Sequence, residues 1–210
     1  MQKNCTGQSF RRGYLAPVGA LVMVLGGVAA TAGAWPERLN ISRMGGDIEV
    51  ANVPDGGTLK TMGGNVLIGK AHNDITVTTM GGNIQIDSAD ASVEATTMGG
   101  NIEATLVKGQ TPAGHDITLK SMGGEITLTV PKDFPMTVDI TLAYTKNNAN
   151  AYKITESLGL EQTGSKDWDS GHGTPRKYLY AKGRIGNGQN HITITTVNGN
   201  VTIKGERSQL

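Results

Sequence analysis

Residues that could do chemistry are sparse in this chain. The densest group is Asp167, Asp169 and His172, which together offer two carboxylates and an imidazole, the ligand types of many metal sites. They fall in the segment 164–175, whose polar, turn-rich composition is typical of a solvated loop. We therefore predict no metal site there.

The glycine pairs suggest a second metal chemistry, because calcium-binding solenoids repeat the pattern Gly-Gly-x-Gly-x-Asp-x-aliphatic. In this chain Ile84 and Ile102 stand where that pattern requires its third glycine, and the aspartate is missing as well. We predict no bound calcium and no cofactor.

Catalysis on a polysaccharide would need acidic or basic groups gathered on one face. His72, His115 and His191 stand at different offsets from their nearest glycine pairs, so they form no row. We predict that the protein is not an enzyme. The loop 108–116 is a place where a site could still be built, so a glycan-binding or carbohydrate-processing β-helix protein stays open as the alternative.

An internal repeat is the element that must position any site. Met-Gly-Gly recurs at intervals of 18 residues from Met44 through Met62 and Met80 to Met98, and a fifth copy at Met122 follows after 24 residues. The six extra residues fall around 108–114. A degenerate sixth copy, Val197-Asn198-Gly199-Asn200, lies near the end of the chain.

Apolar residues alternate with polar ones on both sides of each glycine pair, as Ile75 and Val77 do before it and Ile84 and Ile86 after it. This period of two predicts two short strands per repeat, joined at a glycine corner. An antiparallel meander has no reason to keep identical residues at identical offsets, whereas a solenoid stacks them about 4.8 Å apart. We predict an all-β fold, with a parallel β-solenoid of 18-residue coils over residues 35–130.

Stacked coils would place identical side chains in structural ladders. The predicted methionine ladder is Met44, Met62, Met80, Met98 and Met122. The predicted amide ladder is Asn65, Asn83 and Asn101, with Asp47 as a carboxylate at one end.

The repeat is lost after residue 130, where six aromatic side chains gather. Large side chains suit the end of a solenoid, where no further coil covers the core. We therefore predict that residues 131–210 form a β-rich continuation and cap. Trp168, Tyr178 and Tyr180 form the alternative, an exposed contact patch.

The first 34 residues have the pattern of a cleavable signal peptide. A basic start precedes a small apolar stretch, and Ala32-Gly33-Ala34 fits the small-x-small rule, so we predict cleavage between Ala34 and Trp35. The apolar stretch is too short and too rich in glycine to predict a stable membrane span. Arg11-Arg12 suits the twin-arginine route as well as the Sec route. Both routes lead to the periplasm or the cell exterior.

Cleavage would leave 16 basic and 18 acidic side chains, a net charge of −2, and would remove the single cysteine, Cys5. Nucleic-acid binding needs a basic excess or a basic stripe, so we predict no nucleic-acid partner. The mature fold must be held by packing and backbone hydrogen bonds, because no disulfide can form.

The Thr-x-Gly-Gly-Asn-Ile repeats, the exported start and the closing segment 190–201 resemble the adhesin-like family of bacterial β-strand-repeat proteins. The resemblance covers about residues 40–204. It implies a β-solenoid-like fold at the cell envelope and brings no catalytic residues. We expect an exported, non-enzymatic protein, adhesin-like or envelope-structural, whose partner is an unknown envelope or surface component. Self-association through strand edges is a further expectation.

Overall fold

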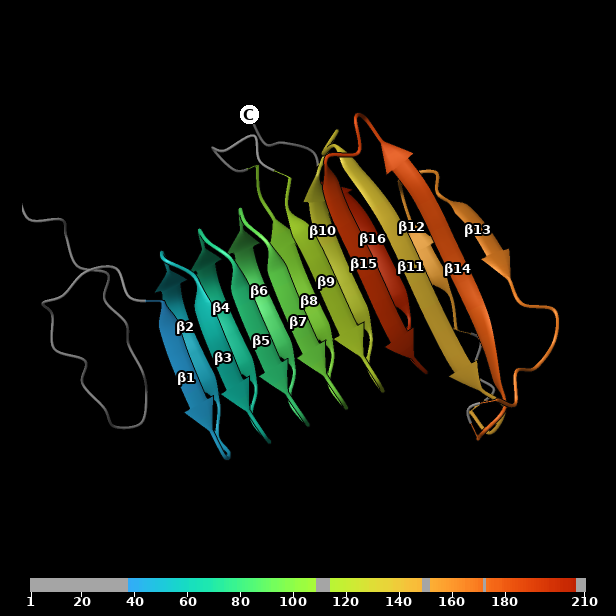
Figure 1. Ribbon diagram of the computed structural model, residues 1–210, viewed down its shortest axis with the longest axis horizontal. Coiled ribbons are helices and arrows are strands. Elements are labelled where there is room, and N and C mark those ends of the chain that lie inside the picture. Colours follow the sequence, from blue (N-terminus) through green and yellow to red (C-terminus); the bar gives the residue numbers. More distant parts are fainter. Residues whose placement is uncertain (1–37, 109–113, 149–151, 172, 207–210) are drawn as a thin grey trace, which may run out of the picture.

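The computed structural model describes residues 38–108, 114–148, 152–171 and 173–206. The described chain is all-β (Figure 1). Its strands are β1 (Leu39–Arg43), β2 (Ile48–Val53), β3 (Gly57–Thr61), β4 (Val66–Ala71), β5 (Ile75–Thr79), β6 (Ile84–Ala89), β7 (Val93–Thr97), β8 (Ile102–Leu106), β9 (Asp116–Ser121), β10 (Ile126–Pro131), β11 (Met136–Thr145), β12 (Ile154–Glu156), β13 (Glu161–Gly164), β14 (Arg176–Ile185), β15 (Asn190–Val197) and β16 (Val201–Glu206).

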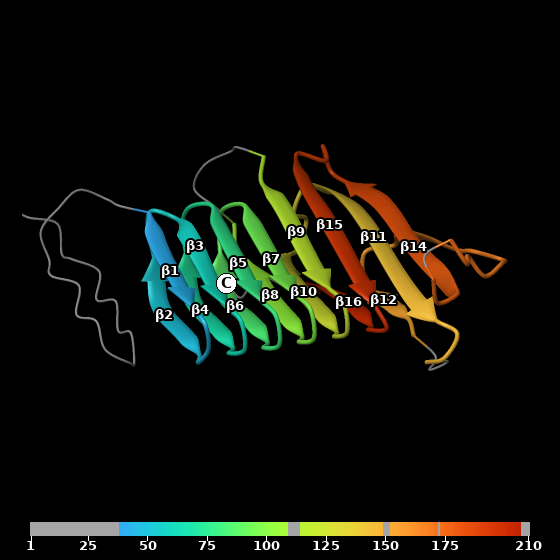
Figure 2. The same ribbon diagram turned by 60° about the horizontal axis from the view of Figure 1, so that its bottom comes forward.

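Each repeat supplies one strand to each of two sheets. The nine-stranded sheet has the order β1-β3-β5-β7-β9-β15-β11-β14-β13, and the seven-stranded sheet has the order β12-β16-β10-β8-β6-β4-β2. Figure 2 shows the first order along one face of the molecule. Strands of successive coils pair in parallel and mostly in register, as in Thr61 with Thr79 and Ile84 with Ile102. The predicted parallel β-solenoid is confirmed, and the meander is excluded.

The core lies between the two sheets because the alternating apolar residues of both point inward. Leu59, Val77 and Ala95 are buried from the first sheet, and Ile68 and Ile86 from the second. Along the coil axis, Ala95 and Ala104 are the small residues in rows otherwise made of valine, isoleucine and leucine. The result is one continuous, thin aliphatic core that needs each neighbouring coil to cover it.

The order of the coils in space differs from their order in the chain. After β10 the chain passes over one coil position and forms β11 to β14, of which β11 and β12 pair in parallel with β15 and β16, and it then returns to fill that position with β15 and β16. These two strands, red in Figure 1, pair with β9 and β10 and so form the coil next to the fifth. The degenerate sixth copy therefore stacks directly on the fifth, and the intervening segment lies beyond it.

The far end of the molecule is an antiparallel region. β11 pairs in parallel with β15 on one side and antiparallel with β14 on the other, and β13 follows β14. Phe134, Leu160 and Ala181 extend the core into this region, with Tyr144 packed against it. The predicted β-rich cap is confirmed in its architecture.

The predicted signal peptide and its cleavage point between Ala34 and Trp35 lie outside the described residues, as do residues 109–113 of the loop and His172. Across the described ranges, no helix has the length and apolar character to cross a bilayer.

Candidate functional site

Buried hydroxyl groups hold the glycine corners together. Thr79 Oγ1 donates to the carbonyl oxygen of Gly64 in the preceding coil at 2.9 Å and accepts from the backbone N–H of Gly82 at 3.2 Å. Thr97 repeats both bonds one coil further on. Thr61, Ser121 and Thr196 also donate to the preceding corner. A hydroxyl at this position therefore satisfies backbone groups of two coils at once.

The second glycine of each pair is required by the stacking. A Cβ atom at Gly64, Gly82, Gly100 or Gly124 would collide with the carbonyl oxygen of the equivalent glycine in the preceding coil. Gly199 meets the carbonyl of Gly124 in the same way, which explains why the degenerate copy keeps this glycine. The close approach of two backbones leaves no room for a side chain.

The side chains after the glycine pairs form a hydrogen-bonded chain along the coil axis. Asp47 Oδ1 accepts from the N–H of Asn65 at 2.7 Å, and each amide oxygen then accepts from the next coil: Asn65 from Asn83, Asn83 from Asn101, and Asn101 from Glu125, at 2.8–2.9 Å. Glu125 accepts from Asn200 at 2.7 Å. Asp47 and the three asparagines accept from backbone N–H groups, and Glu125 accepts from the Asn200 side chain, so the repetition of these residues has a structural cause.

The methionines lie on the outside of the same corners. Met44 is 85% exposed, and Met62, Met80, Met98 and Met122 are 46–56% exposed. Met62, Met80, Met98 and Met122 are each bracketed by in-register residues, since the hydroxyl residue before the methionine and the second glycine after it both stack on the preceding coil. We call these five side chains the methionine edge.

The first glycine of each pair has no such steric cause. A Cβ atom at Gly45, Gly63 or Gly81 would meet no heavy atom of the described residues within 4 Å, and at Gly99 and Gly123 the nearest atoms are at 3.7 and 3.5 Å. Among these five, none has a positive φ. Methionine and the glycine after it are thus identical in five coils although packing does not require them.

Other exposed positions of the repeat have diverged. The outward row of the seven-stranded sheet, read from one coil to the next, is Glu49, Leu67, Gln85, Glu103 and Thr127. A corresponding row of the nine-stranded sheet is Asn40, Thr58, Thr76, Glu94 and Thr118. Repeat duplication alone has therefore not kept outward residues identical, and the exceptions without a packing cause are the methionine edge and the glycine after each methionine.

The methionine position of the repeat can be followed into the cap by strand register. Val197 occupies the methionine position of the sixth coil, Val197 pairs with Ala143, and Ala143 pairs with Tyr178. Tyr178 stacks on Tyr180, with ring centroids 6.0 Å apart and planes at 11°. Ala143 is buried, so the exposed apolar row is interrupted between Val197 and the tyrosine pair.

The structure divides the three aromatic residues of the predicted contact patch between two places. Trp168 packs edge-on against Tyr144 at 5.8 Å, and Lys177 Nζ lies 5.3 Å from its ring centroid. Strand alternation places Lys177 and Leu179 on one face of β14, and Tyr178 and Tyr180 on the other. Leu179 packs against the core, so the tyrosine pair faces outward.

Tyr178 also lies where the tyrosine pair meets the segment that carries Trp168. Its hydroxyl donates to Asp169 Oδ2 at 3.4 Å, and Asp169 is bridged to Arg176 through the backbone. Burial, together with the charge of Asp169, raises the pKa of Tyr178 above 10.0. Tyr178 therefore stays a neutral donor through the physiological range.

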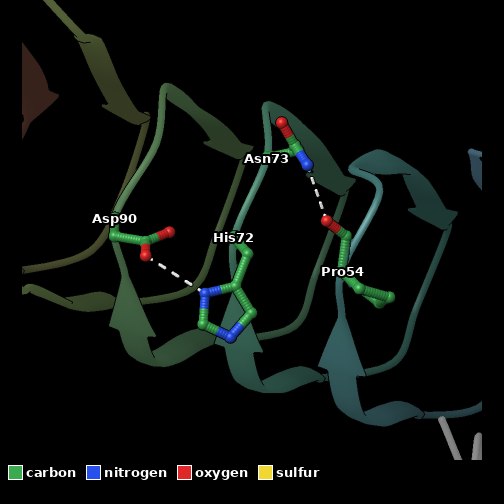
Figure 3. Close-up of polar contacts among 4 residues, drawn as sticks. All are labelled: Pro54, His72, Asn73 and Asp90. Carbon is green, nitrogen blue, oxygen red and sulfur yellow. Dashed lines mark hydrogen bonds and ion pairs between the residues drawn. The ribbon is translucent and has the colours of Figure 1, made fainter. Parts of the chain in front are cut away.

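The corners opposite the glycine pairs hold the candidate acid–base residues. Figure 3 shows His72 Nδ1 at 3.1 Å from Asp90 Oδ2 in the next coil, and Asn73 Nδ2 donating to the carbonyl of Pro54 in the preceding coil at 2.6 Å. The His72 side chain is half exposed. These contacts join adjacent coils.

The other histidines are placed apart from this pair. His115 lies beside Asn190, whose Oδ1 accepts from its backbone N–H at 2.9 Å, and His191 lies next along β15 with an exposed side chain. In the part of the chain that the structure describes, no three His, Cys, Asp or Glu side chains gather as a metal site would require. A shallow hollow near Asp47, Glu49 and Asn83 is lined by both polar and apolar groups.

Sequence reasoning found the residues of the methionine edge but not their exposure. Alternation stops at the corner, so the pattern did not indicate whether methionine points inward or outward.

Comparison with protein-family models, with curated proteins and with solved structures found no match for this chain.

Proposed function

We propose that the protein is an exported, non-enzymatic component of the bacterial cell envelope that acts by surface interaction, in an adhesin-like or envelope-structural role. The observation that carries this proposal is the methionine edge, a row of exposed apolar side chains kept identical in five coils without a packing requirement. Exposed methionine suits recognition, because its flexible thioether chain adapts to varied partner surfaces.

The surface beside the edge supports the same role. The outer face of the nine-stranded sheet is a regular array rich in threonine, in which the row next to the methionine edge is Ser42, Lys60, Thr78, Thr96, Lys120, Thr195, Thr141 and Tyr180. Strands stacked in register hold this array rigidly, so little conformational entropy is lost when a partner binds. The expected export would place that surface in the envelope.

The partner is expected to be an envelope component with an apolar surface, and the test uses isolated envelope fragments of the source bacterium. The full chain should co-sediment with them. Replacing the five edge methionines by serine should reduce the bound fraction at least tenfold, whereas replacing them by leucine should preserve it, because leucine keeps the apolar surface.

A matched control carries alanine at Gln85, Glu103 and Thr127, on the outward face of the other sheet, and should bind like the parent. Equal binding by the serine variant and the parent would overturn a role for the edge. Absence of binding by the parent would overturn the proposed function itself.

The glycan-binding alternative is favoured by one observation, the stacked pair Tyr178 and Tyr180 on the outer face of β14. Two nearly parallel rings form a flat platform beside the polar groups of Asp169 and Thr163. A glycan panel tests this second candidate: binding to a defined sugar must be lost in Tyr180→Ala and kept in Tyr152→Phe. A uniformly negative panel would remove it.

A further inference from the structure

We propose that the methionine edge binds a soft monovalent metal ion, copper(I) or the chemically similar silver(I), between the thioether sulfurs of successive coils. This inference goes beyond the proposed function, because it requires no macromolecular partner. It concerns the same five side chains but a different property of them, the sulfur atom and not the apolar surface.

The ligand chemistry selects the ion. Thioether sulfur is a soft, uncharged ligand that favours copper(I), whereas calcium, magnesium and manganese prefer oxygen. The sequence patterns that resemble metal sites, the calcium-like repeats and residues 167–172, offer only oxygen and nitrogen ligands and so do not point to this chemistry.

The repeat provides the spacing that two-coordinate binding needs. Adjacent parallel strands lie about 4.8 Å apart, and the methionines are bracketed by stacked residues on both sides, so successive methionine backbones share that spacing. Zinc–thiolate bonds are about 2.3 Å long, and a linear unit built from metal–sulfur bonds of about that length spans roughly 4.6 Å. Neighbouring rungs can therefore bind one ion with little rearrangement.

Exposure makes the sulfurs accessible. The four inner rungs are 46–56% exposed, so each can receive an ion from solvent. Met136 provides the contrast, because it is 1% exposed and packed in the core. An apolar surface alone would be equally well served by leucine or isoleucine, yet all five intact corners carry methionine.

The test follows the methionine methyl groups of the full chain by NMR, with [¹³C]methyl-methionine labelling and silver(I) as a probe that does not change oxidation state. Cys5 is first replaced by serine, because its thiol would bind silver(I). The methyl resonances of Met62, Met80 and Met98 should shift on addition of silver(I), and that of Met136 should not. Magnesium should shift none of them.

Two double variants separate a ladder site from independent methionines. Met62→Leu with Met98→Leu leaves Met44, Met80 and Met122, of which no two are on adjacent coils. Met44→Leu with Met122→Leu removes the same number of sulfurs but leaves three adjacent rungs. The first variant should lose at least tenfold in silver(I) affinity, and the second should stay within about threefold of the parent.

Absence of methyl shifts with excess silver(I), or equal affinities of the two double variants, would overturn the proposal. Leucine keeps the apolar edge, so envelope binding should survive in both variants. Failure of metal binding is thereby distinguishable from failure of the proposed function.

Discussion

The two kinds of corner in the solenoid close the same coils but differ in how regularly their residues repeat. At the glycine corners, exactly four residues separate the strands in each of the first five coils, from Arg43 to Ile48 through to Ser121 to Ile126. At the opposite corners the separation is three residues in three cases, as between Ala89 and Val93, and nine residues between Leu106 and Asp116. The first kind repeats the same residues and bonds in each coil, whereas the second joins the coils by backbone hydrogen bonds and carries side chains that differ from coil to coil.

This difference shows which repetition needs a functional explanation. Threonine, the second glycine and asparagine each have a packing or hydrogen-bonding partner in the next coil. Methionine and the first glycine have none that would fix their identity. The fold thus requires threonine, the second glycine and asparagine at these corners, and it only permits methionine and the first glycine.

The largest effect is expected at the second glycine. Gly82→Ala should lower the free energy of unfolding by about 3 kcal/mol or more, because the new methyl group collides with the carbonyl of Gly64 and both coils must shift. Gly81→Ala is the matched control and should change it by less than about 0.5 kcal/mol. Urea unfolding measures both, and equal losses would refute the division of roles within the glycine pair.

A smaller loss is expected at the buried hydroxyl. Thr79→Val keeps the shape of the side chain but leaves backbone groups of Gly64 and Gly82 without this partner, which should cost about 2 kcal/mol. Thr78→Val, on the outward face of the same strand, should cost less than about 0.5 kcal/mol. The same unfolding measurement applies, and a stable Thr79→Val protein would show that the bonds to the corner are dispensable.

The exposed amide chain should contribute less per residue. Asn83→Ala removes the acceptor of the Asn101 N–H, and water can replace part of that bond, so we expect a loss of about 1 kcal/mol. Glu103→Ala serves as the exposed control. A loss at Asn83 no larger than at Glu103 would remove the amide chain from the structural account.

At the opposite corner, His72→Ala should change the free energy of unfolding by less than about 0.5 kcal/mol, because the contact to Asp90 is partly exposed and salt-screened. Thermal or urea unfolding at low and high salt measures this. A loss above about 2 kcal/mol would show that these corners are as tightly specified as the glycine corners.

The cap should show a small pH effect. Burial alone would raise the pKa of Glu156, but hydrogen bonds from the backbone of Leu158, Leu160 and Gly159 and from the Gln162 side chain outweigh it and lower the pKa below 4.5. Since the folded state favours the carboxylate, its contribution is present above about pH 4.5 and is lost as the pH falls further. Glu156→Gln should therefore be less stable than the parent at pH 7, and the difference should shrink towards pH 3. A constant difference would contradict this assignment.

Much of the fold could be predicted because its period is local. Identical offsets predicted parallel stacking, and alternation predicted which side chains are buried, as at Ile84 and Ile86. The period could not place the sixth copy in space, because nothing in the spacing of Val197-Asn198-Gly199-Asn200 says that β11 to β14 lie outside it. The return of the chain to the fifth coil depends on tertiary contacts, namely the pairing of the long strands β11 and β15, and not on the local period.

The candidate site was less predictable. Alternation within β14 predicts that Tyr178 and Tyr180 share a face, and they do. The position of Trp168 depends on how its loop folds back against Tyr144, which no local pattern encodes. Exposure of the methionine edge likewise follows from the path of the backbone through the corner.

The central claim is that the methionine edge is kept for what it binds and not for the fold. Urea unfolding of the full chain with all five edge methionines replaced by serine tests this most directly. The account predicts a total loss below about 2.5 kcal/mol, since each of the five sites is exposed and should change the free energy of unfolding by less than about 0.5 kcal/mol. A loss above about 5 kcal/mol, comparable with the whole stability of a small domain, would show that the methionines hold the coils together.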